Sequence, residues 1–401
     1  MATQPTSSSS SGGSATYGYY ETYPVGMVPG PTSVPQHVRD AFAIDYASAD
    51  LELPFFELYA HVQTRLAEFL RVPSSSASSS SLPYENDVII QVGEGMLALW
   101  SALKSTIKAG DRVLAISNGV YGSGFAEMAK QIGADVRVVE FEYDQPLHDF
   151  GRIAEVARSF KPHLITAVQC ETPSGMMNRI APLGRIARDV DALLYVDFVS
   201  AAFGADVRVG EWDIDLGLLG SQKALSSTPS LSIVTVSPRA WRKIEAVAYV
   251  GYDALLPWRG ALARRFFPYT FDWHSLAALG RALDAVAADG GLESQLARHS
   301  AVAAYCRRQE DDDDDGGVGF ASTVTAIYVP LGRGGFESWA AFDGALRARG
   351  LVVGGSYGPL LEGKVFRLGH MGSQADMALV TRALDLLQSV ISTSTPSSSS
   401  S

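Results

Sequence analysis

The strongest constraint on the fold is a regular alternation of short apolar runs with helical stretches between Asp87 and Val236. Strands that alternate with helices in this way form a largely parallel sheet covered by helices on both faces. Ligands of such sheets bind at the carboxyl ends of the strands, so chemistry is expected there. The candidate strands are Val88–Val92, Arg112–Ile116, Asp135–Glu140, Leu164–Val168, Leu193–Val196, Leu216–Leu219 and Ser232–Val236, and the candidate helices are Met96–Lys108, Ser123–Ile132, Phe150–Phe160 and Leu183–Val190.

The pattern divides the chain into a large and a small domain. Residues 23–290 are expected to form the large, ligand-binding domain, and the different pattern after Gly291 predicts a smaller α/β domain over residues 291–390. Both tails, residues 1–22 and 391–401, are rich in Ser, Thr or Gly and are predicted to be disordered. The Ser74–Ser81 tract and the acidic run Asp311–Asp315 are predicted to be surface loops.

Composition excludes several classes of partner and site. A net charge of −11 argues against nucleic acid, since binding phosphates requires a basic surface. Cys170 and Cys306 are the only cysteines, too few for a disulfide framework or a Cys-rich metal site, so no metal is expected. No apolar run is long enough to span a membrane, and neither a secretory signal nor a C-terminal peroxisomal signal is seen, so we expect a cytoplasmic protein.

A lysine and an aspartate follow two neighbouring candidate strands. Gly220-Ser221-Gln222-Lys223-Ala224 comes directly after Leu216–Leu219, and Asp197 comes directly after Leu193–Val196. Desolvation lowers the pKa of a lysine and makes its amine a nucleophile toward carbonyls. A carboxylate beside a pyridine nitrogen keeps the ring protonated and improves it as an electron sink. Either residue alone is commonly a surface or capping residue, but the pair at one sheet edge indicates pyridoxal chemistry.

Two further segments fit a planar, phosphorylated ligand. Val92-Gly93-Glu94-Gly95-Met96 closes a strand and opens a helix, and the backbone N–H groups of such a turn bind anions. Tyr121, in Gly119-Val120-Tyr121-Gly122, follows the next strand and is placed to stack on a planar ring. Each signal is weak alone, because many strand-to-helix turns look alike and a tyrosine in a turn commonly just packs.

Several segments, taken together and in this order, resemble the class V aminotransferases of fold type I, the group of alanine–glyoxylate and serine–pyruvate aminotransferases. The similarity covers Met27 to Leu387. It implies an α/β fold with a large, mostly parallel sheet sandwiched by helices and a smaller C-terminal α/β domain. The matching segments are Val28-Pro29-Gly30-Pro31-Thr32, Gly119-Val120-Tyr121-Gly122, Glu171-Thr172-Pro173-Ser174-Gly175, Val196-Asp197-Phe198-Val199-Ser200, Gly220-Ser221-Gln222-Lys223-Ala224 and Phe366-Arg367-Leu368-Gly369.

The resemblance implies pyridoxal 5′-phosphate as the cofactor and assigns the residues around its ring. Lys223 would hold the cofactor as a Schiff base and later move protons between substrate and cofactor carbons. Asp197 would pair with the pyridine nitrogen, Tyr121 would stack on the ring, and Thr172 would lie near the 3-hydroxyl group.

The same resemblance assigns the phosphate and the substrate carboxylate. Gln222 and the Gly95 and Met96 amides would hold the phosphate. Thr270 would reach the phosphate of the partner subunit, so a homodimer is implied. Arg367 would bind the substrate carboxylate through two parallel hydrogen bonds, a task for which a guanidinium is better shaped than an ammonium group.

Two positions, Glu94 and Phe267, depart from the family pattern. Glu94 stands where alanine–glyoxylate enzymes carry a phosphate-binding Ser, and Phe267, in place of a phosphate-binding Tyr, cannot donate a hydrogen bond. The related pyridoxamine–pyruvate aminotransferase shares the Gly-Glu step and uses unphosphorylated pyridoxamine, but it carries a second substrate arginine where this chain has Tyr357. Glu94 either points inward and opposes a phosphate or points outward and caps the following helix. The presence of Gln222 and Thr270 favours the outward orientation.

The expected activity is transfer of an amino group between a small amino acid, alanine- or serine-like, and a 2-oxo acid such as glyoxylate or pyruvate. The alternatives are pyridoxamine–pyruvate-type transamination, a lyase or biosynthetic enzyme on the same scaffold, and a non-catalytic binding protein. Related lyases often use a reactive cysteine, whereas Cys170 is expected to pack in the core. Lys223, Asp197 and Arg367 together argue against a non-catalytic protein.

Overall fold

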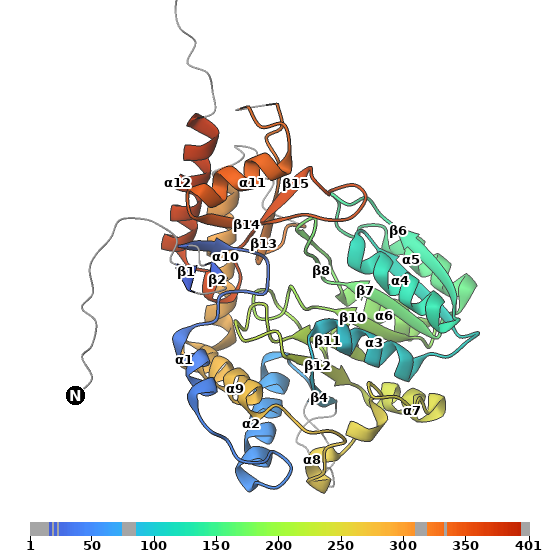
Figure 1. The fold of residues 1–401 in the computed structure, drawn as a ribbon. Helices are drawn as coiled ribbons and strands as arrows, with labels where there is room; N and C mark the ends of the chain where they lie inside the picture. Colours follow the sequence, from blue (N-terminus) through green and yellow to red (C-terminus); the bar gives the residue numbers. More distant parts are fainter. Residues whose placement is uncertain are drawn as a thin grey trace, which may run out of the picture.

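A computed structural model describes residues 16–17, 20–21, 24–73, 86–308, 319–332 and 335–393 (Figure 1). The tract Ser74–Ser81 and the run Asp311–Asp315 lie outside the described residues, as do most of the two predicted tails. Within the N-terminal tail, β1 (Thr16–Tyr17) and β2 (Tyr20–Glu21) pair antiparallel. These four residues are therefore not disordered as predicted. The prediction followed the Ser- and Gly-rich composition of the whole tail, whereas threonine and tyrosine favour extended structure.

The large domain is built on a seven-stranded sheet with the strand order β4-β12-β11-β10-β7-β5-β6. Neighbours from β11 to β6 pair in parallel, and β12 runs antiparallel to both β11 and β4. The prediction of a largely parallel sheet is confirmed. The bounds are β4 (Asp87–Val92), β12 (Leu231–Val236), β11 (Leu216–Gly220), β10 (Leu193–Asp197), β7 (Leu164–Val168), β5 (Arg112–Ser117) and β6 (Asp135–Glu140).

Helices cover this sheet and connect its strands (Figure 1). Those between successive strands are α3 (Gly95–Thr106), α4 (Val120–Ile132), α5 (Phe150–Phe160) and α6 (Ala181–Asp189), and α7 (Pro238–Val247) follows β12. The long helix α9 (Trp273–Ala288), which packs against α2 (Leu53–Phe69), was not predicted. Ten of its sixteen residues are buried, which leaves only a narrow polar stripe that includes His274, Arg281 and Asp284, so the apolar spacing typical of a surface helix is weak here.

The smaller domain holds a four-stranded sheet with the order β13-β15-β14-β3. Its strands are β13 (Val324–Tyr328), β15 (Val365–Gly369), β14 (Leu351–Gly355) and β3 (Val25–Met27), and its helices are α10 (Gly291–Arg308), α11 (Trp339–Ala348) and α12 (Met377–Thr393). Strand β3 pairs in parallel with β14. Residues 25–27, which the sequence placed in the large domain, therefore extend the small sheet, and a three-residue strand gives no periodic signal of this.

Short elements complete the chain. The two-residue strands β8 (Cys170–Glu171) and β9 (Met176–Met177) form a hairpin after β7. The remaining turns of helix are α1 (Gln36–Arg39), η1 (Asp40–Ala43), η2 (Leu256–Trp258), α8 (Ala261–Arg264) and η3 (Gly372–Gln374).

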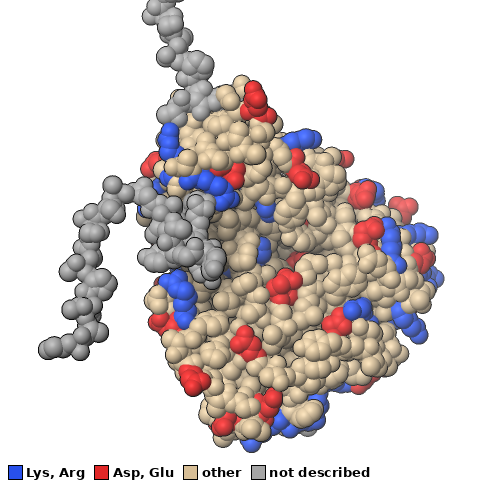
Figure 2. Space-filling view, in the orientation of Figure 1, with Lys and Arg blue, Asp and Glu red and all other residues tan. Residues whose placement is uncertain are grey.

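The surface carries charges of both signs. Figure 2 shows basic and acidic side chains interspersed around one face of the molecule, with no continuous basic track for a nucleic-acid backbone on that face. In the part of the chain that the structure describes, no helix combines the length and the apolar character needed to cross a membrane.

The outer edge of the large sheet at β4 is closed by Tyr59 of α2. The buried Tyr59 hydroxyl accepts a hydrogen bond from the Ile90 N–H at 3.0 Å and donates one to the Ile90 carbonyl at 3.1 Å. These two backbone groups have no other strand to pair with, since β4 is the last strand on its side.

We predict that Tyr59→Phe lowers the free energy of unfolding by about 1–3 kcal/mol, because two buried backbone groups lose their partner. The measurement is urea denaturation followed by circular dichroism. Tyr328→Phe, at a tyrosine whose side chain is 74% exposed, is the control and is expected to change stability by less than about 0.5 kcal/mol. Equal midpoints for the two variants would contradict the edge-closing role.

Candidate active site

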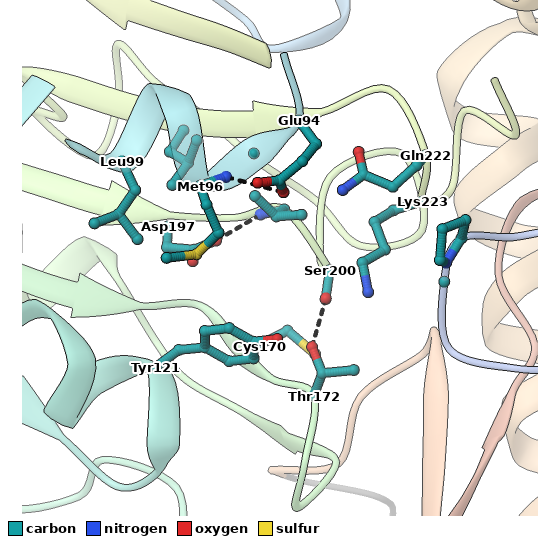
Figure 3. Close-up of a pocket in the computed structure, with 15 residues that line it drawn as sticks. Glu94, Met96, Leu99, Tyr121, Cys170, Thr172, Asp197, Ser200, Gln222 and Lys223 are labelled. Atoms are coloured by element: carbon teal, nitrogen blue, oxygen red, sulfur yellow. Dashed lines mark hydrogen bonds between the residues drawn. The ribbon is translucent and has the colours of Figure 1, made fainter. Parts of the chain in front are cut away.

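A cavity of about 200 Å³ opens at the carboxyl ends of the large sheet's strands (Figure 3). It brings together most of the predicted site residues, which arrive from the ends of different strands as the sheet topology requires. Arg367 and Thr270 do not line this cavity. The predicted residues that line it are Glu94, Gly95, Met96, Tyr121, Thr172, Asp197, Gln222 and Lys223.

Lys223 lies in the loop after β11 and extends into the cavity (Figure 3). Its Nζ donates a hydrogen bond to the Pro29 carbonyl. Gly30 has φ +102°, which favours glycine, and a Cβ there would lie 2.5 Å from Lys223 Cδ and displace the lysine side chain. Burial, together with the charge of Arg367, lowers the pKa of Lys223 to about 8. At pH 7 about a tenth of the amine is then unprotonated, far more than for an ordinary lysine, and this fraction is available as a nucleophile or a base.

The backbone of the Lys223 loop is held from two sides. Thr32 Oγ1, from the N-terminal segment, donates to the Lys223 carbonyl at 2.9 Å. The Ser373 N–H, from the small domain, donates to Ser226 Oγ at 2.7 Å. A Cβ at Gly372 would lie 2.1 Å from the same Ser226 oxygen, so the two loops are in direct contact. The position of the lysine thus depends on segments at both ends of the chain.

Asp197 ends β10, the strand next to β11. Its Oδ1 accepts a hydrogen bond from the Val199 N–H at 2.8 Å, which fixes the carboxylate at the cavity wall. Burial raises the pKa of Asp197 to about 6, although the charge of Lys223 acts in the opposite direction. A buried carboxylate of this kind is stabilised by a cationic N–H donor, which the predicted pyridinium would supply.

Tyr121 is positioned by Glu171, a residue whose role the sequence analysis missed. The fully buried Glu171 carboxylate accepts hydrogen bonds from the Tyr121 N–H at 3.2 Å and the Gly122 N–H at 2.7 Å. It thereby caps the N-terminus of α4, where a negative charge is favourable. Burial raises the pKa of Glu171 to about 7. The available signal was an acidic residue within a matched segment directly after a buried strand.

Thr172 and Cys170 also line the cavity and lie near Tyr121 in Figure 3. Thr172 Oγ1 is 2.5 Å from Ser200 Oγ, and both residues line the cavity. Cys170 is buried, and burial raises the pKa of its thiol to about 12. The thiol therefore stays protonated at neutral pH and is a poor nucleophile, which supports the expected packing role.

Glu94 is the N-cap of α3 and also a wall of the cavity (Figure 3). Its Oε2 accepts a hydrogen bond from the Met96 N–H at 3.0 Å. The inward and outward orientations contrasted above are therefore not exclusive, because the helix start itself borders the cavity. Gln222 also lines the cavity, and its buried side-chain oxygen has no hydrogen-bond partner among the described residues, so it can bind a ligand there.

Arg367, on β15, lies next to the cavity rather than in its lining. Its Nη2 donates to the Gly355 carbonyl at 2.6 Å, and its guanidinium carbon lies 4.8 Å from the centre of the Tyr357 ring. The Tyr357 hydroxyl is hydrogen-bonded to that of Tyr121, which does line the cavity. Thr270 lies in a separate hollow of about 600 Å³, so a single chain does not bring it to Lys223.

The described residues contain no group of three His, Cys, Asp or Glu side chains that could hold a metal ion.

Comparison with known proteins identifies close parallels. Residues 91–311 match the family model described as aminotransferase class-V. An L-aspartate–glyoxylate aminotransferase of Paracoccus denitrificans is 29% identical over 88% of both chains. A pyridoxamine–pyruvate transaminase of Mesorhizobium japonicum is 31% identical over 77% of this chain and 80% of its own. The crystal structure of an alanine–glyoxylate aminotransferase from Nostoc superimposes with a TM-score of 0.82 at 25% identity, covering 94% of this chain and 97% of that one.

The lowered pKa predicts how Lys223 reacts with small electrophiles. Because the unprotonated amine is the nucleophile, its labelling rate should rise with pH, pass half-maximum near pH 8 and level off above it. The labelling rate of an ordinary lysine, whose pKa is about 10.4, is still rising at pH values where that of Lys223 has levelled off. The measurement is acetic anhydride labelling of the cofactor-free protein from about pH 6 to pH 10, read by peptide mass spectrometry. The exposed Lys108 and Lys161 are internal references, and a Lys223 profile that follows theirs would contradict the prediction.

Proposed function

The chain belongs to the class V aminotransferases, and on that premise we propose that it transfers an amino group between a small amino acid, alanine- or serine-like, and a 2-oxo acid such as glyoxylate or pyruvate. The observation that carries the proposal is that the Lys223 amine and the Asp197 carboxylate line the same cavity, at the ends of adjacent strands. With a pKa of about 8, Lys223 can both accept and donate a proton near neutral pH, as amino transfer requires.

The residues of the cavity fit pyridoxal 5′-phosphate, the cofactor that the family implies. Around the ring, Lys223 would hold the aldehyde, Asp197 would bind the pyridine N–H, Tyr121 would lie against the ring face, and Thr172 would lie near the 3-hydroxyl group. When bound, the cofactor supplies an electron sink that stabilises negative charge at the substrate's α-carbon. The buried Asp197 carboxylate, with its raised pKa, supports this assignment because a ring cation would stabilise it.

At the phosphate end, Gln222 and the Gly95 and Met96 amides would hold the phosphate. The unpartnered Gln222 side-chain oxygen marks a polar position that a ligand would complete, and the amide can turn to present its N–H₂ group to an anion. The N-terminus of α3 adds backbone donors and the positive end of a helix dipole.

The chain's own residues would then move one proton and hold one carboxylate. The unprotonated Lys223 amine removes the proton from the substrate's α-carbon and, once protonated, is the acid that returns a proton. Arg367 orients the substrate by its carboxylate, and its buried Nε, which has no hydrogen-bond partner among the described residues, can donate a hydrogen bond to that carboxylate. Amino acids are preferred over simple amines because only they use this donor.

We also propose that the protein acts as a homodimer in which Thr270 of one subunit completes the phosphate site of the other. Thr270 lies beside Tyr252 and Phe266, whose side chains are 67% and 68% exposed, and the nearby Val250 is 91% exposed. Such a concentration of exposed apolar side chains is unfavourable in water and typical of an interface. A second copy of the chain would cover it. A monomer in sedimentation equilibrium would contradict this arrangement.

Lys223→Ala tests the activity directly. We expect transamination between alanine and glyoxylate to fall by about 10³-fold or more, since both the cofactor anchor and the base are lost. Circular dichroism and sedimentation should be unchanged, because the side chain projects into a cavity. Lys108→Ala, at an exposed lysine, is the control and should keep full activity. Substantial turnover by Lys223→Ala with any small amino acid would refute the proposal.

A second candidate, pyridoxamine–pyruvate-type transamination, is favoured by the position of Glu94. The Glu94 carboxylate accepts the Met96 N–H that a phosphate would use, and it borders the cavity. Phe267, which stands where the family carries a phosphate-binding tyrosine, is buried against Phe55 and Tyr59 and cannot donate a hydrogen bond. Both features weaken the phosphate site and favour a ligand with a neutral hydroxymethyl group. The neutral Tyr357, in place of a second arginine, opposes this candidate.

The protonated Cys170 thiol gives no support to a cysteine-dependent lyase.

Glu94→Ser distinguishes the two candidates. A carboxylate about 4 Å from a phosphate, at an effective dielectric constant near 20, repels even a single negative charge by about 4 kcal/mol. If the second candidate is right, removing this carboxylate strengthens binding of pyridoxal phosphate by up to about three orders of magnitude and weakens binding of pyridoxal; if the first candidate is right, both affinities stay the same. Both dissociation constants are measured by equilibrium dialysis, with Glu57→Ser on the exposed face of α2 as the control. Unchanged affinities would show that Glu94 only caps α3 and does not oppose the phosphate, and pyridoxamine–pyruvate-type transamination would lose its main support.

A further inference from the structure

Tyr357 lies between the two residues assigned to the substrate carboxylate and to the cofactor ring. Its ring faces the guanidinium of Arg367, whose Cζ lies 4.8 Å from the ring centre. Its hydroxyl is hydrogen-bonded to the Tyr121 hydroxyl, and the two rings meet edge to face at 6.2 Å. One small-domain side chain thus contacts the predicted carboxylate clamp and the predicted ring-stacking residue of the large domain.

The loop that carries Tyr357 is itself fixed against the large domain. Ser356 Oγ donates a hydrogen bond to the Pro173 carbonyl at 2.7 Å. Gly358 has φ +93°, and a Cβ there would lie 2.5 Å from Val120 Cγ2, at the start of α4. These contacts come from residues on either side of Tyr357, so its ring has a defined place between the domains.

The environment of Arg367 shows why such a support matters. The side chain is buried, and burial lowers the pKa of its guanidinium. Nη2 donates to the Gly355 carbonyl at 2.6 Å, whereas the buried Nε has no hydrogen-bond partner in the part of the chain that the structure describes. The Tyr357 ring supports the face of the guanidinium and leaves its edge free, and hydrogen bonds to a carboxylate are made along that edge.

We propose that Tyr357 is a positioning residue that holds Arg367 and links it to Tyr121, so that the carboxylate clamp and the ring-stacking residue are set as one unit. A stacked ring restricts rotation of the arginine side chain, and the hydroxyl pair fixes the clamp relative to the large domain. The substrate's α-carbon is then held at a defined distance from the Lys223 amine. This inference rests on the proposed function, because it requires that Arg367 binds the substrate carboxylate.

The test measures carboxylate binding in the full-length holoenzyme. Propionate, a carboxylate without an amino group, is titrated while the cofactor absorbance is followed, and KM and kcat are measured separately for alanine. Tyr357→Leu, which removes the stacked ring, should raise the propionate Kd and the alanine KM by about 5- to 20-fold. Tyr357→Phe keeps the ring and should raise both by about 2- to 3-fold. Tyr328→Phe, at an exposed tyrosine of the small-domain sheet, is the control and should change neither the propionate Kd nor the alanine KM.

A double-mutant cycle tests the link to Tyr121 without disturbing the packing. Tyr121→Phe and Tyr357→Phe remove the two partners of one hydrogen bond, so the double variant should bind propionate no more weakly than the weaker single variant. Additive losses would overturn the link, and a propionate Kd for Tyr357→Leu within twofold of the parent would overturn the support of Arg367. If Tyr357→Leu does not fold, the cycle still decides the link to Tyr121, and Tyr357→Met, which also removes the ring, takes its place in the test of the Arg367 support.

Arg367→Lys separates failure of this inference from failure of the proposed function. If Arg367→Lys weakens propionate binding at least tenfold but Tyr357→Leu changes the propionate Kd by less than twofold, the clamp stands and only the positioning role falls. If Arg367→Lys leaves the propionate Kd unchanged, the carboxylate clamp itself is wrong, and the inference falls with it.

Discussion

The site depends on the burial of one lysine where three parts of the chain meet. Lys223 extends from the large sheet, its amine bonds the Pro29 carbonyl of the N-terminal segment, and its loop is held through Ser226 by the small domain. Burial in this setting lowers the lysine's pKa to about 8, which a solvent-exposed loop would not do. The fold is thus arranged to keep one amine both reactive and in place.

The charges around Lys223 follow the same physical logic. Asp197 and Glu171 are buried carboxylates whose pKa values are raised, and each is held by backbone N–H groups. Glu171 accepts backbone hydrogen bonds from the start of α4, whereas Asp197 lines the cavity, where the proposed pyridinium ring would stabilise its negative charge. Arg367 supplies positive charge from the other domain. Two similar carboxylates therefore have different roles, which their surroundings determine.

Sequence reasoning succeeded where chemistry follows from topology. The carboxyl ends of parallel strands meet at one edge, so the alternating pattern placed Lys223 and Asp197 together before their contacts were known. It failed for interactions between distant segments, such as β3 pairing with β14. The Tyr121–Tyr357 contact joins residues 236 positions apart, and no local spacing predicts it. Thr270 remains a prediction, because a single chain cannot show what it contributes to a partner.

The central claim is that Lys223 is the residue that carries the cofactor, and borohydride reduction tests it most directly. The purified holoenzyme is reduced, digested and analysed by peptide mass spectrometry, so that the cofactor becomes permanently fixed to the amine that holds it. The account predicts one modified site, Lys223, with the surface lysines unmodified. Modification at another lysine, with Lys223 unmodified in a protein that holds its cofactor, would contradict it.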